Sequence, residues 1–234
     1  MIDFLLVESE FIRFGNSHRV ILLLLILGAI CAVLLGRKLK KSKNLKLENK
    51  LNRCFAIAVL VVQLPLQIYS MLPQHWSLAN SLPFQLCDLA WMATIYALWT
   101  QKKWAYSLVY YWALTLTSQA FLTPILQFDF PHLQFTMFWL AHAFVVLAAI
   151  YLTWGLGNRP RWKDFKFAYL FTLSWMAFVF VFNLVFDTNY LYLNDKPLGT
   201  IMDAFGPWPI YILVEMAIIA IVWSAMTYPW NKKV

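Results

Sequence analysis

The chain has little charge. Only 13% of its 234 residues are charged, about half the share of an ordinary soluble domain, whereas 62% are hydrophobic. Its 7 glycines and 10 prolines are too few for a flexible linker or a low-complexity tail. We therefore expect one compact membrane-embedded unit without a separate soluble catalytic domain.

Cysteine is also scarce, with 3 residues in the chain. Cys31 and Cys54 fall in the expected inner halves of two apolar runs, and Cys87 falls near the outer end of a third. Because Cys87 differs in depth from both other cysteines, its pairing with either is geometrically unfavourable, and we expect no disulfide framework. The apolar runs are continuous, whereas barrel strands alternate in polarity over about ten residues. The sequence therefore predicts an all-α membrane protein.

Long apolar runs dominate what is present. A helix needs about 20 apolar residues to cross the hydrocarbon core. Seven runs meet this requirement, namely 20–36, 54–72, 82–99, 104–126, 133–154, 167–186 and 208–228. An acidic leader before the first run and a basic loop after it indicate a retained helix rather than a cleaved signal peptide. The predicted fold is a polytopic seven-transmembrane-helix bundle that forms a single membrane domain over 1–234.

Basic residues are distributed unevenly between the two sides of this bundle. Sixteen of the 19 Lys and Arg residues fall in alternate connections and in the tail, namely Arg37, Lys38, Lys40, Lys41, Lys43, Lys46, Lys50, Arg53, Lys102, Lys103, Arg159, Arg161, Lys163, Lys166, Lys232 and Lys233. The positive-inside rule then predicts an N-terminus outside and a cytoplasmic C-terminus. Orientation explains the net charge of +8. We expect membrane phospholipids as partners and no nucleic acid. Gly155 and Gly157 are expected to form a cytoplasmic turn.

Polar side chains within the apolar runs are the first candidates for a functional site. A charged side chain at mid-membrane costs about 2.5 to 3.5 kcal/mol on insertion scales. The polar residues of the runs are Gln63, Gln67, Gln85, Cys87, Asp88, Ser118, Gln119, His142, Asn183 and Glu215. The predicted directions of the helices put most of them in the outer half of the bilayer. The sequence therefore predicts a polar cavity that opens outward.

Cys87 and His142 are the candidate catalytic residues. A rise of about 1.5 Å per residue puts Cys87 roughly 8 Å and His142 roughly 14 Å below the outer boundary. At similar depth, the imidazole can take the thiol proton, and the thiolate can then attack an acyl carbonyl. The alternative is structural, with Cys87 as a small packing residue and His142 in an interhelical hydrogen bond.

The remaining polar and aromatic residues are candidates for substrate binding. Glu215 shares a helical stripe with Trp208 and Tyr211, and its carboxyl group can either orient the histidine or bond between helices. Asp88 points about 100° away from the preceding cysteine around the helix. The expected substrate-binding residues are Glu215, Asp88, Asn183, Gln119, Trp208 and Tyr211. We expect no cofactor and no metal, because the outer-loop histidines have no further ligands at metal spacing.

Two segments resemble a known family. LPFQLCD at 82–88 and DTNYLYLNDKPLGTIMDAFGPWPIY at 187–211 are similar to the YwaF-like bacterial integral membrane proteins, which are related to the eukaryotic transmembrane protein 164 family. The resemblance extends over all seven runs and includes Ser17, His18 and the FWLAHAF segment around His142. This chain has Gln85 where the family pattern often has histidine.

The resemblance implies a seven-helix fold and an acyl-transfer activity. The eukaryotic branch is assigned phospholipid acyltransferase activity resting on a helix-three cysteine and a helix-five histidine, and these positions match Cys87 and His142. Kinship with seven-pass lipid hydrolases is also implied. A carrier and a ligand-binding sensor are the alternatives. The polar residues of the runs lie mainly on one side, which favours a one-sided site over a carrier with alternating access.

Overall fold

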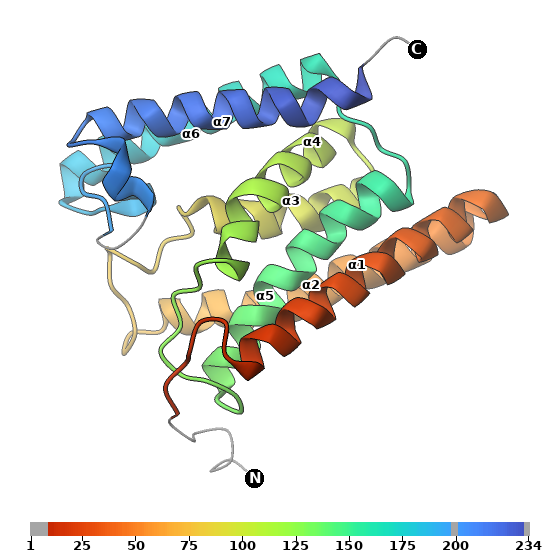
Figure 1. Cartoon of the computed structure of the whole chain (residues 1–234), viewed down its shortest axis with the longest axis horizontal. Coiled ribbons are helices and arrows are strands. Elements are labelled where there is room, and N and C mark those ends of the chain that lie inside the picture. Colours follow the sequence, from red (N-terminus) through yellow and green to blue (C-terminus); the bar gives the residue numbers. More distant parts are fainter. Residues whose placement is uncertain (1–8, 198–200, 232–234) are drawn as a thin grey trace. The chain divides into compact units, whose positions relative to one another are not determined.

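The computed structural model describes residues 9–197 and 201–231. Lys232, Lys233 and part of the 187–211 segment lie outside the described residues. In the described part the chain is helical, apart from loops and a single isolated bridge between Glu10 and Phe128. The α-helices are α1 (Asn16–Ser42), α2 (Leu45–Met71), α3 (Leu86–Thr100), α4 (Lys103–Tyr111), α5 (Leu133–Ile150), α6 (Trp162–Phe186) and α7 (Ile210–Thr227) (Figure 1).

Short π- and 3-10-helical segments continue or connect these helices. The π-helical segments are η2 (Trp112–Leu116) and η4 (Tyr151–Gly155), and the 3-10 segments are η3 (Thr117–Phe121), η5 (Tyr190–Tyr192), η6 (Ile201–Phe205) and η7 (Tyr228–Trp230). The two π segments directly extend α4 and α5. Such segments are rare and widen a helix locally, so they change which side chains face its neighbours.

The all-α prediction is confirmed, and the chain is a multi-pass membrane protein. Five of the predicted runs form helices that are long and apolar enough to span a bilayer, namely α1, α2, α5 with η4, α6 and α7 with its continuation. The third run gives a helix of 15 residues and the fourth an α-helix of 9 residues followed by η2 and η3. The seven-span count therefore stays a prediction.

Several helix starts differ from the predicted runs, since α1 and α6 begin earlier, at Asn16 and Trp162, and α2 and α3 differ for identifiable reasons. α2 begins at Leu45 rather than near residue 54, because its first turns are polar and a hydropathy pattern does not register them. α3 begins at Leu86 rather than Leu82. Pro83 disfavours a helical conformation at the residue before it, so the chain at 82–85 is held as a loop instead.

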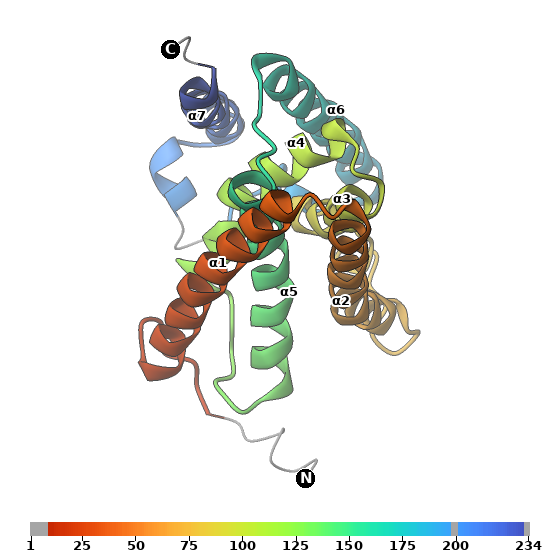
Figure 2. The same cartoon turned by 90° about the vertical axis from the view of Figure 1, so that its right-hand side faces the viewer.

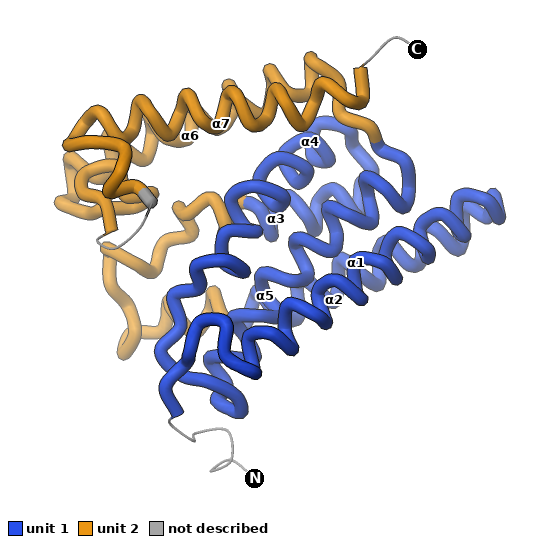
Figure 3. Tube along the Cα trace, viewed as in Figure 1, with its two compact units in different colours: residues 1–65, 90–158 blue, residues 66–89, 159–234 orange. Residues whose placement is uncertain are grey.

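The chain divides into two compact units (Figure 3). The first unit comprises residues 1–65 and 90–158, which include α1, α4, α5 and most of α2 and α3. The second unit comprises 66–89 and 159–234, which include α6, α7 and the segment that leads into α3.

In the first unit, α5 lies between α1 and α2 (Figure 2). Gln63 donates from Nε2 to the backbone oxygen of Ala141 at 3.0 Å, and this bond fastens α2 to α5. On the other side, α1 approaches η4 so closely that a Cβ atom on Gly36 would lie 2.5 Å from Gly155 Cα. The expectation of a turn at Gly155 is wrong, because this glycine is helical and permits the backbone contact. Gly157 has a φ of +79°, which suits a turn.

The N-terminal end of α1 is tied to the start of α5. His18 is fully buried and accepts a bond from the Phe14 N–H at Nδ1, with an N···N distance of 2.9 Å. Its Nε2 lies 3.0 Å from the backbone oxygen of Phe121, and its ring stacks on Trp139. Ser17 Oγ donates to Asp129 Oδ2 at 2.8 Å. These contacts give the Ser17 and His18 pair a structural role.

The other end of the first unit holds a buried polar cluster. Glu48 is buried and pairs with Lys40 Nζ at 3.0 Å. Tyr151 donates its hydroxyl to Asn52 Oδ1 at 2.7 Å, and Asn52 Nδ2 has no partner among the described residues. Polar residues therefore also lie at this end of the unit, outside the apolar runs, and a one-sided set of polar residues within the runs stays a prediction. Glu48 and Asn52 precede the apolar run at 54–72, so the hydropathy pattern assigned them to a loop.

Candidate functional site

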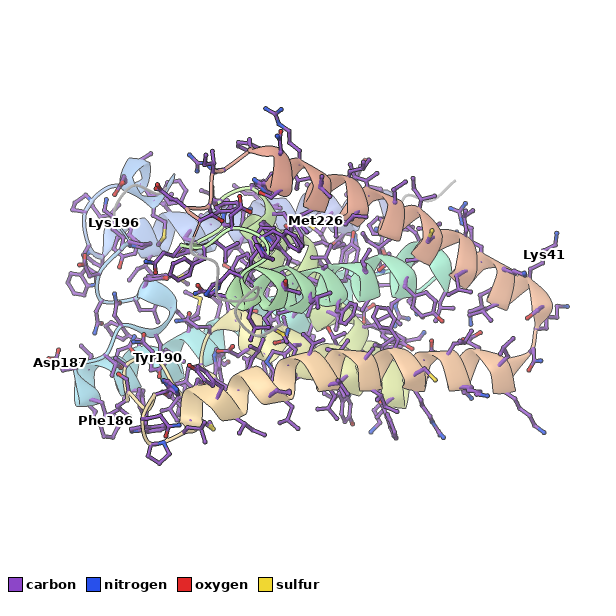
Figure 4. All side chains as sticks on the ribbon, turned by 90° about the horizontal axis from the view of Figure 1, so that it is seen from below. Lys41, Phe186, Asp187, Tyr190, Lys196 and Met226 are labelled. Atoms are coloured by element: carbon purple, nitrogen blue, oxygen red, sulfur yellow. The ribbon has the colours of Figure 1, made fainter. Side chains whose placement is uncertain are left out.

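The end of α6 forms a clamp around the backbone of Tyr190. Asn183 is fully buried in the last turn of α6. Its Nδ2 donates to the Tyr190 backbone oxygen at 2.8 Å, and its Oδ1 accepts from Tyr190 N at 3.0 Å and from Thr188 Oγ1 at 2.8 Å. Figure 4 shows Asp187 and Tyr190 together at this end of the helix. The Asn183 amide is thus used to fix the loop.

The Tyr190 side chain then holds the segment that leads into α3. Its hydroxyl donates to the Leu78 backbone oxygen at 2.8 Å and accepts from the Leu82 N–H at 3.0 Å. Its ring meets Phe84 edge-on at 5.3 Å between centroids. Burial raises the pKa of the Tyr190 phenol, the bond from the Leu82 N–H offsets part of this rise, and the charge of Asp88 adds to it. The hydroxyl therefore keeps the proton that it donates.

Three further contacts fix the start of α3. Asp88 Oδ2 accepts from the Gln85 N–H at 3.0 Å, which caps the first turn of the helix. The Gln85 side-chain oxygen accepts from Leu191 N at 3.2 Å. Trp175 on α6 donates its indole N–H to the Phe84 backbone oxygen at 3.1 Å. The helix start is therefore bonded both to η5 and to α6.

Cys87 is the second residue of α3 and is half-buried. The first backbone N–H groups of a helix have no partners within the helix, and the helix dipole puts partial positive charge there. A thiolate is stabilised at such a position, and reactive cysteines of other proteins use it. The local fold thus gives this cysteine an environment that suits a nucleophile.

Two aromatic residues near the start of α7 bond to the same loop. Trp208 donates its indole N–H to the Leu193 backbone oxygen at 3.0 Å, and Tyr211 donates its hydroxyl to the Tyr192 backbone oxygen at 2.5 Å. Lys196 reaches the backbone oxygen of Gly206 at 3.1 Å, which closes the loop between η5 and α7. Glu215, one turn further along α7, is half-buried and has no hydrogen bond within the described part of the second unit.

His142 lies on α5 in the first unit, and its tautomer is fixed by a backbone contact. Nδ1 lies 2.7 Å from the Phe138 backbone oxygen. Because a carbonyl oxygen only accepts, Nδ1 carries the hydrogen and Nε2 keeps its lone pair. The imidazole is half-buried, with the Phe138 ring at 4.3 Å from its own. This tautomer is the one that a general base requires at Nε2.

The predicted site residues divide between the two units. Six of them belong to the second unit, namely Cys87, Asp88, Asn183, Trp208, Tyr211 and Glu215, and two belong to the first, namely Gln119 and His142. Gln119 is exposed in η3. A shared pocket for Cys87 and His142 stays a prediction, because each unit is described by itself. Within the described residues, no three His, Cys, Asp or Glu side chains gather as metal ligands would.

Sequence reasoning missed the part played by Tyr190. It lies in the 187–211 segment, outside every apolar run, so a search restricted to polar residues within the runs passed over it. The signal that was available was its setting, since two asparagines, a threonine and two tyrosines cluster in NLVFDTNYLY at the end of an apolar helix. Such residues commonly bond to nearby backbone at helix ends and turns.

Comparison with known proteins gives one family match. The sequence model of the TMEM164 family matches residues 13–227, which is most of the chain. The match includes both glycines of the α1 contact, the Tyr190 loop and the two candidate catalytic residues. No curated protein and no solved structure gives a significant match.

Proposed function

Because this chain belongs to the TMEM164 family, we propose that it is a membrane enzyme that cleaves an acyl ester of a phospholipid through Cys87 and His142. We assign it to the YwaF-like bacterial branch, on the LPFQLCD segment and on the segment at 187–211. The acyl group goes to a second lipid hydroxyl in a transferase or to water in a hydrolase. No cofactor takes part in this scheme.

The proposed reaction has two steps. His142 Nε2 takes the proton from Cys87 Sγ, and the sulfur attacks the ester carbonyl carbon. Collapse of the tetrahedral intermediate breaks the carbon–oxygen bond, and the imidazolium returns its proton to the departing glycerol oxygen. The acyl group then forms a thioester on Cys87. A hydroxyl or a water molecule, deprotonated by the same imidazole, attacks the thioester and restores the thiol.

The fixed tautomer of His142 is the observation that carries this proposal. A histidine that acts only as a bond between helices uses either nitrogen, whereas a general base needs its lone pair at the nitrogen that faces the nucleophile. The bond of Nδ1 to Phe138 O holds the proton away from Nε2 without using a charged partner. The position of Cys87 in the first turn of α3 supports the same scheme from the side of the nucleophile.

The other six predicted residues have two kinds of proposed role. Glu215, Gln119 and the exposed Trp208 ring are proposed to contact the lipid. The side chains of the first two make no hydrogen bond among the described residues, and the third residue is 53% exposed. The side chains of Asn183, Asp88 and Tyr211 form hydrogen bonds with backbone groups of the loop and of the α3 start. We propose that these three shape the wall of the substrate site.

Lipid mass spectrometry on purified protein tests the proposal. Wild-type protein incubated with defined phospholipids should yield lysophospholipid together with a new acylated lipid or free fatty acid. Cys87→Ala should yield neither product. Cys31→Ala and Cys54→Ala are the matched controls, because both cysteines are exposed and lie in the first unit. Full turnover by folded Cys87→Ala protein would refute the enzyme assignment.

We also propose that the start of α1 faces outward and the α1–α2 connection faces the cytoplasm. The bias of basic residues supports this orientation. A cysteine at position 46 and a cysteine at position 195 are suitable probes, because both side chains are exposed. In a background without native cysteines, an impermeant maleimide on intact cells should label position 195 alone. Labelling of position 46 alone would invert the orientation.

A carrier is the second candidate, and a specific cluster favours it. Glu48, Asn52 and Tyr151 form buried polar contacts at one end of the first unit, while His18 and Asp129 form others at the opposite end. Alternating access needs polar groups at both ends. In lipid vesicles, exchange of a labelled lipid or solute that survives Cys87→Ala would favour the carrier over the enzyme.

A further inference from the structure

The start of α3 depends on a chain of contacts that begins far away in sequence. Asn183 clamps the backbone of Tyr190, and the Tyr190 hydroxyl bonds to two backbone groups of the 78–82 segment. Gln85 bonds to Leu191 from the helix start. All of these residues belong to the second unit, as does Cys87.

We propose that Tyr190 is a positioning residue for Cys87, which it holds in the first turn of α3 by fixing the segment that precedes the helix. This inference rests on the proposed function, because the position of the Cys87 thiol affects activity only if the thiol reacts. It assigns to Tyr190 and its Asn183 clamp a role in reactivity without any contact with the substrate.

The geometry explains why a hydroxyl is needed there. Leu78 O and Leu82 N belong to the loop between α2 and α3, so neither is paired within a regular helix. The Tyr190 hydroxyl acts as donor to one and acceptor to the other, and it thereby replaces the missing helical bonds. Phenylalanine at this position keeps the ring packing against Phe84 but supplies neither bond.

The consequence for Cys87 follows from the helix start. If the segment before Leu86 is not held, the first turn of α3 frays. A thiolate in the first turn of a helix is stabilised by the partial positive charge at the helix N-terminus, and fraying of that turn weakens this stabilisation. The stabilisation at a helix N-terminus corresponds to a factor of about 2 to 5 in the population of the charged form.

Alkylation of Cys87 tests the proposal without lipid turnover. In Cys31→Ala, Cys54→Ala protein in detergent, the rate constant of Cys87 alkylation by iodoacetamide is measured from pH 6 to pH 10. Tyr190→Phe should slow the reaction about 2- to 5-fold near neutral pH and move the midpoint of the profile upward. Tyr192→Phe is the matched control and should leave the profile unchanged, because the exposed Tyr192 hydroxyl has no hydrogen bond among the described residues.

A second variant keeps the test decisive if Tyr190→Phe does not fold. Gln85→Leu removes the acceptor of Leu191 N and leaves Tyr190 intact. It should change the alkylation profile in the same direction. Folded Tyr190→Phe or Gln85→Leu protein with the wild-type profile would overturn the positioning role.

The outcomes for the two proposals are separable. A changed alkylation profile in Tyr190→Phe, together with wild-type protein that turns over no phospholipid, supports positioning and refutes the enzyme. Turnover that requires Cys87, together with an unchanged profile in Tyr190→Phe, refutes positioning and leaves the enzyme proposal intact.

Discussion

The two units use polar residues in different ways. In the first unit, polar side chains join one helix to another, as Gln63 joins α2 to α5 and Tyr151 joins η4 to α2. In the second unit, Asn183 and Tyr190 bond to backbone groups of loops, while Tyr169 joins α6 to α7 by donating its hydroxyl to the Met216 backbone oxygen. Among the polar residues of the apolar runs, Gln63 therefore makes a helix–helix bond, whereas Asn183 anchors a loop.

The difference bears on the site. Bonds between helices hold the positions of long elements, whereas bonds to loop backbone set where a helix begins. Cys87 lies in the first turn of α3 because side-chain bonds to backbone groups set where this helix begins. His142 departs from both patterns, since it bonds within its own helix and keeps one nitrogen available.

The largest expected effect tests whether the two candidate catalytic residues act together. Cys87→Ala and His142→Ala should each reduce acyl turnover by about 10²-fold to 10⁴-fold or more, as loss of a general base does. The double variant should be little worse than either single variant, because members of a catalytic unit are strongly non-additive. Turnover is followed by lipid mass spectrometry on protein with a wild-type elution profile. Additive losses would show that the residues act independently.

Cys87→Ser sharpens this test. It preserves the shape of the side chain, but the hydroxyl ionises far less readily than the thiol, so most turnover should be lost while lipid binding is retained. Retained turnover in Cys87→Ser would leave the thiol a packing residue.

The second effect probes the first unit, where the helices approach most closely. Gly36→Ala should lower the free energy of unfolding by about 1 to 3 kcal/mol through overpacking, because the new Cβ atom would meet the Gly155 backbone at 2.5 Å. Gly28→Ala is the matched control on the same helix. Its Cβ atom would meet the flexible Leu147 side chain at 3.2 Å, which can move aside. Unfolding in a denaturing detergent measures both variants, and equal losses would contradict the backbone contact.

The third effect probes the loop anchor of the second unit. Asn183→Ala leaves the buried Tyr190 N–H and carbonyl without partners, so the free energy of unfolding should fall by about 1 to 3 kcal/mol. Asn80→Ala is the control, because Asn80 is exposed and its side chain makes no hydrogen bond among the described residues. Proteolysis within 187–197 should speed up only in Asn183→Ala. An Asn183→Ala protein as stable as Asn80→Ala would show that the Asn183 bonds to Tyr190 do not stabilise the second unit.

Much of the helical architecture could be predicted from the sequence, because long apolar runs have few alternatives in a membrane. The starts of helices were harder. The polar first turns of α2 look like a loop in a hydropathy pattern, whereas Pro83 is a local signal that could have moved the start of α3 to Leu86.

The candidate site was less predictable for a different physical reason. Gly155 shows its function only when Gly36 lies opposite, and Asn183 shows its function only when the loop folds back on α6. Both contacts join residues that are apart in the chain, and a single sequence does not show which residues will lie against each other. The helix that carries Cys87 follows from local pattern, and its depth stays a prediction, whereas the tautomer of His142 follows from a backbone bond that a pattern does not reveal.

The smallest expected effect concerns the polar cluster of the first unit. Tyr151→Phe removes the hydroxyl that bonds to Asn52 Oδ1 and leaves the ring in place against Phe55. Because Asn52 Nδ2 already has no partner among the described residues, the variant leaves a buried amide without any bond there. The free energy of unfolding should fall by about 1 kcal/mol. If acyl turnover persists at the wild-type rate, the cluster serves stability alone. A loss of labelled-solute exchange in vesicles, with unfolding unchanged, would instead give the cluster a transport role and break the division between the two units.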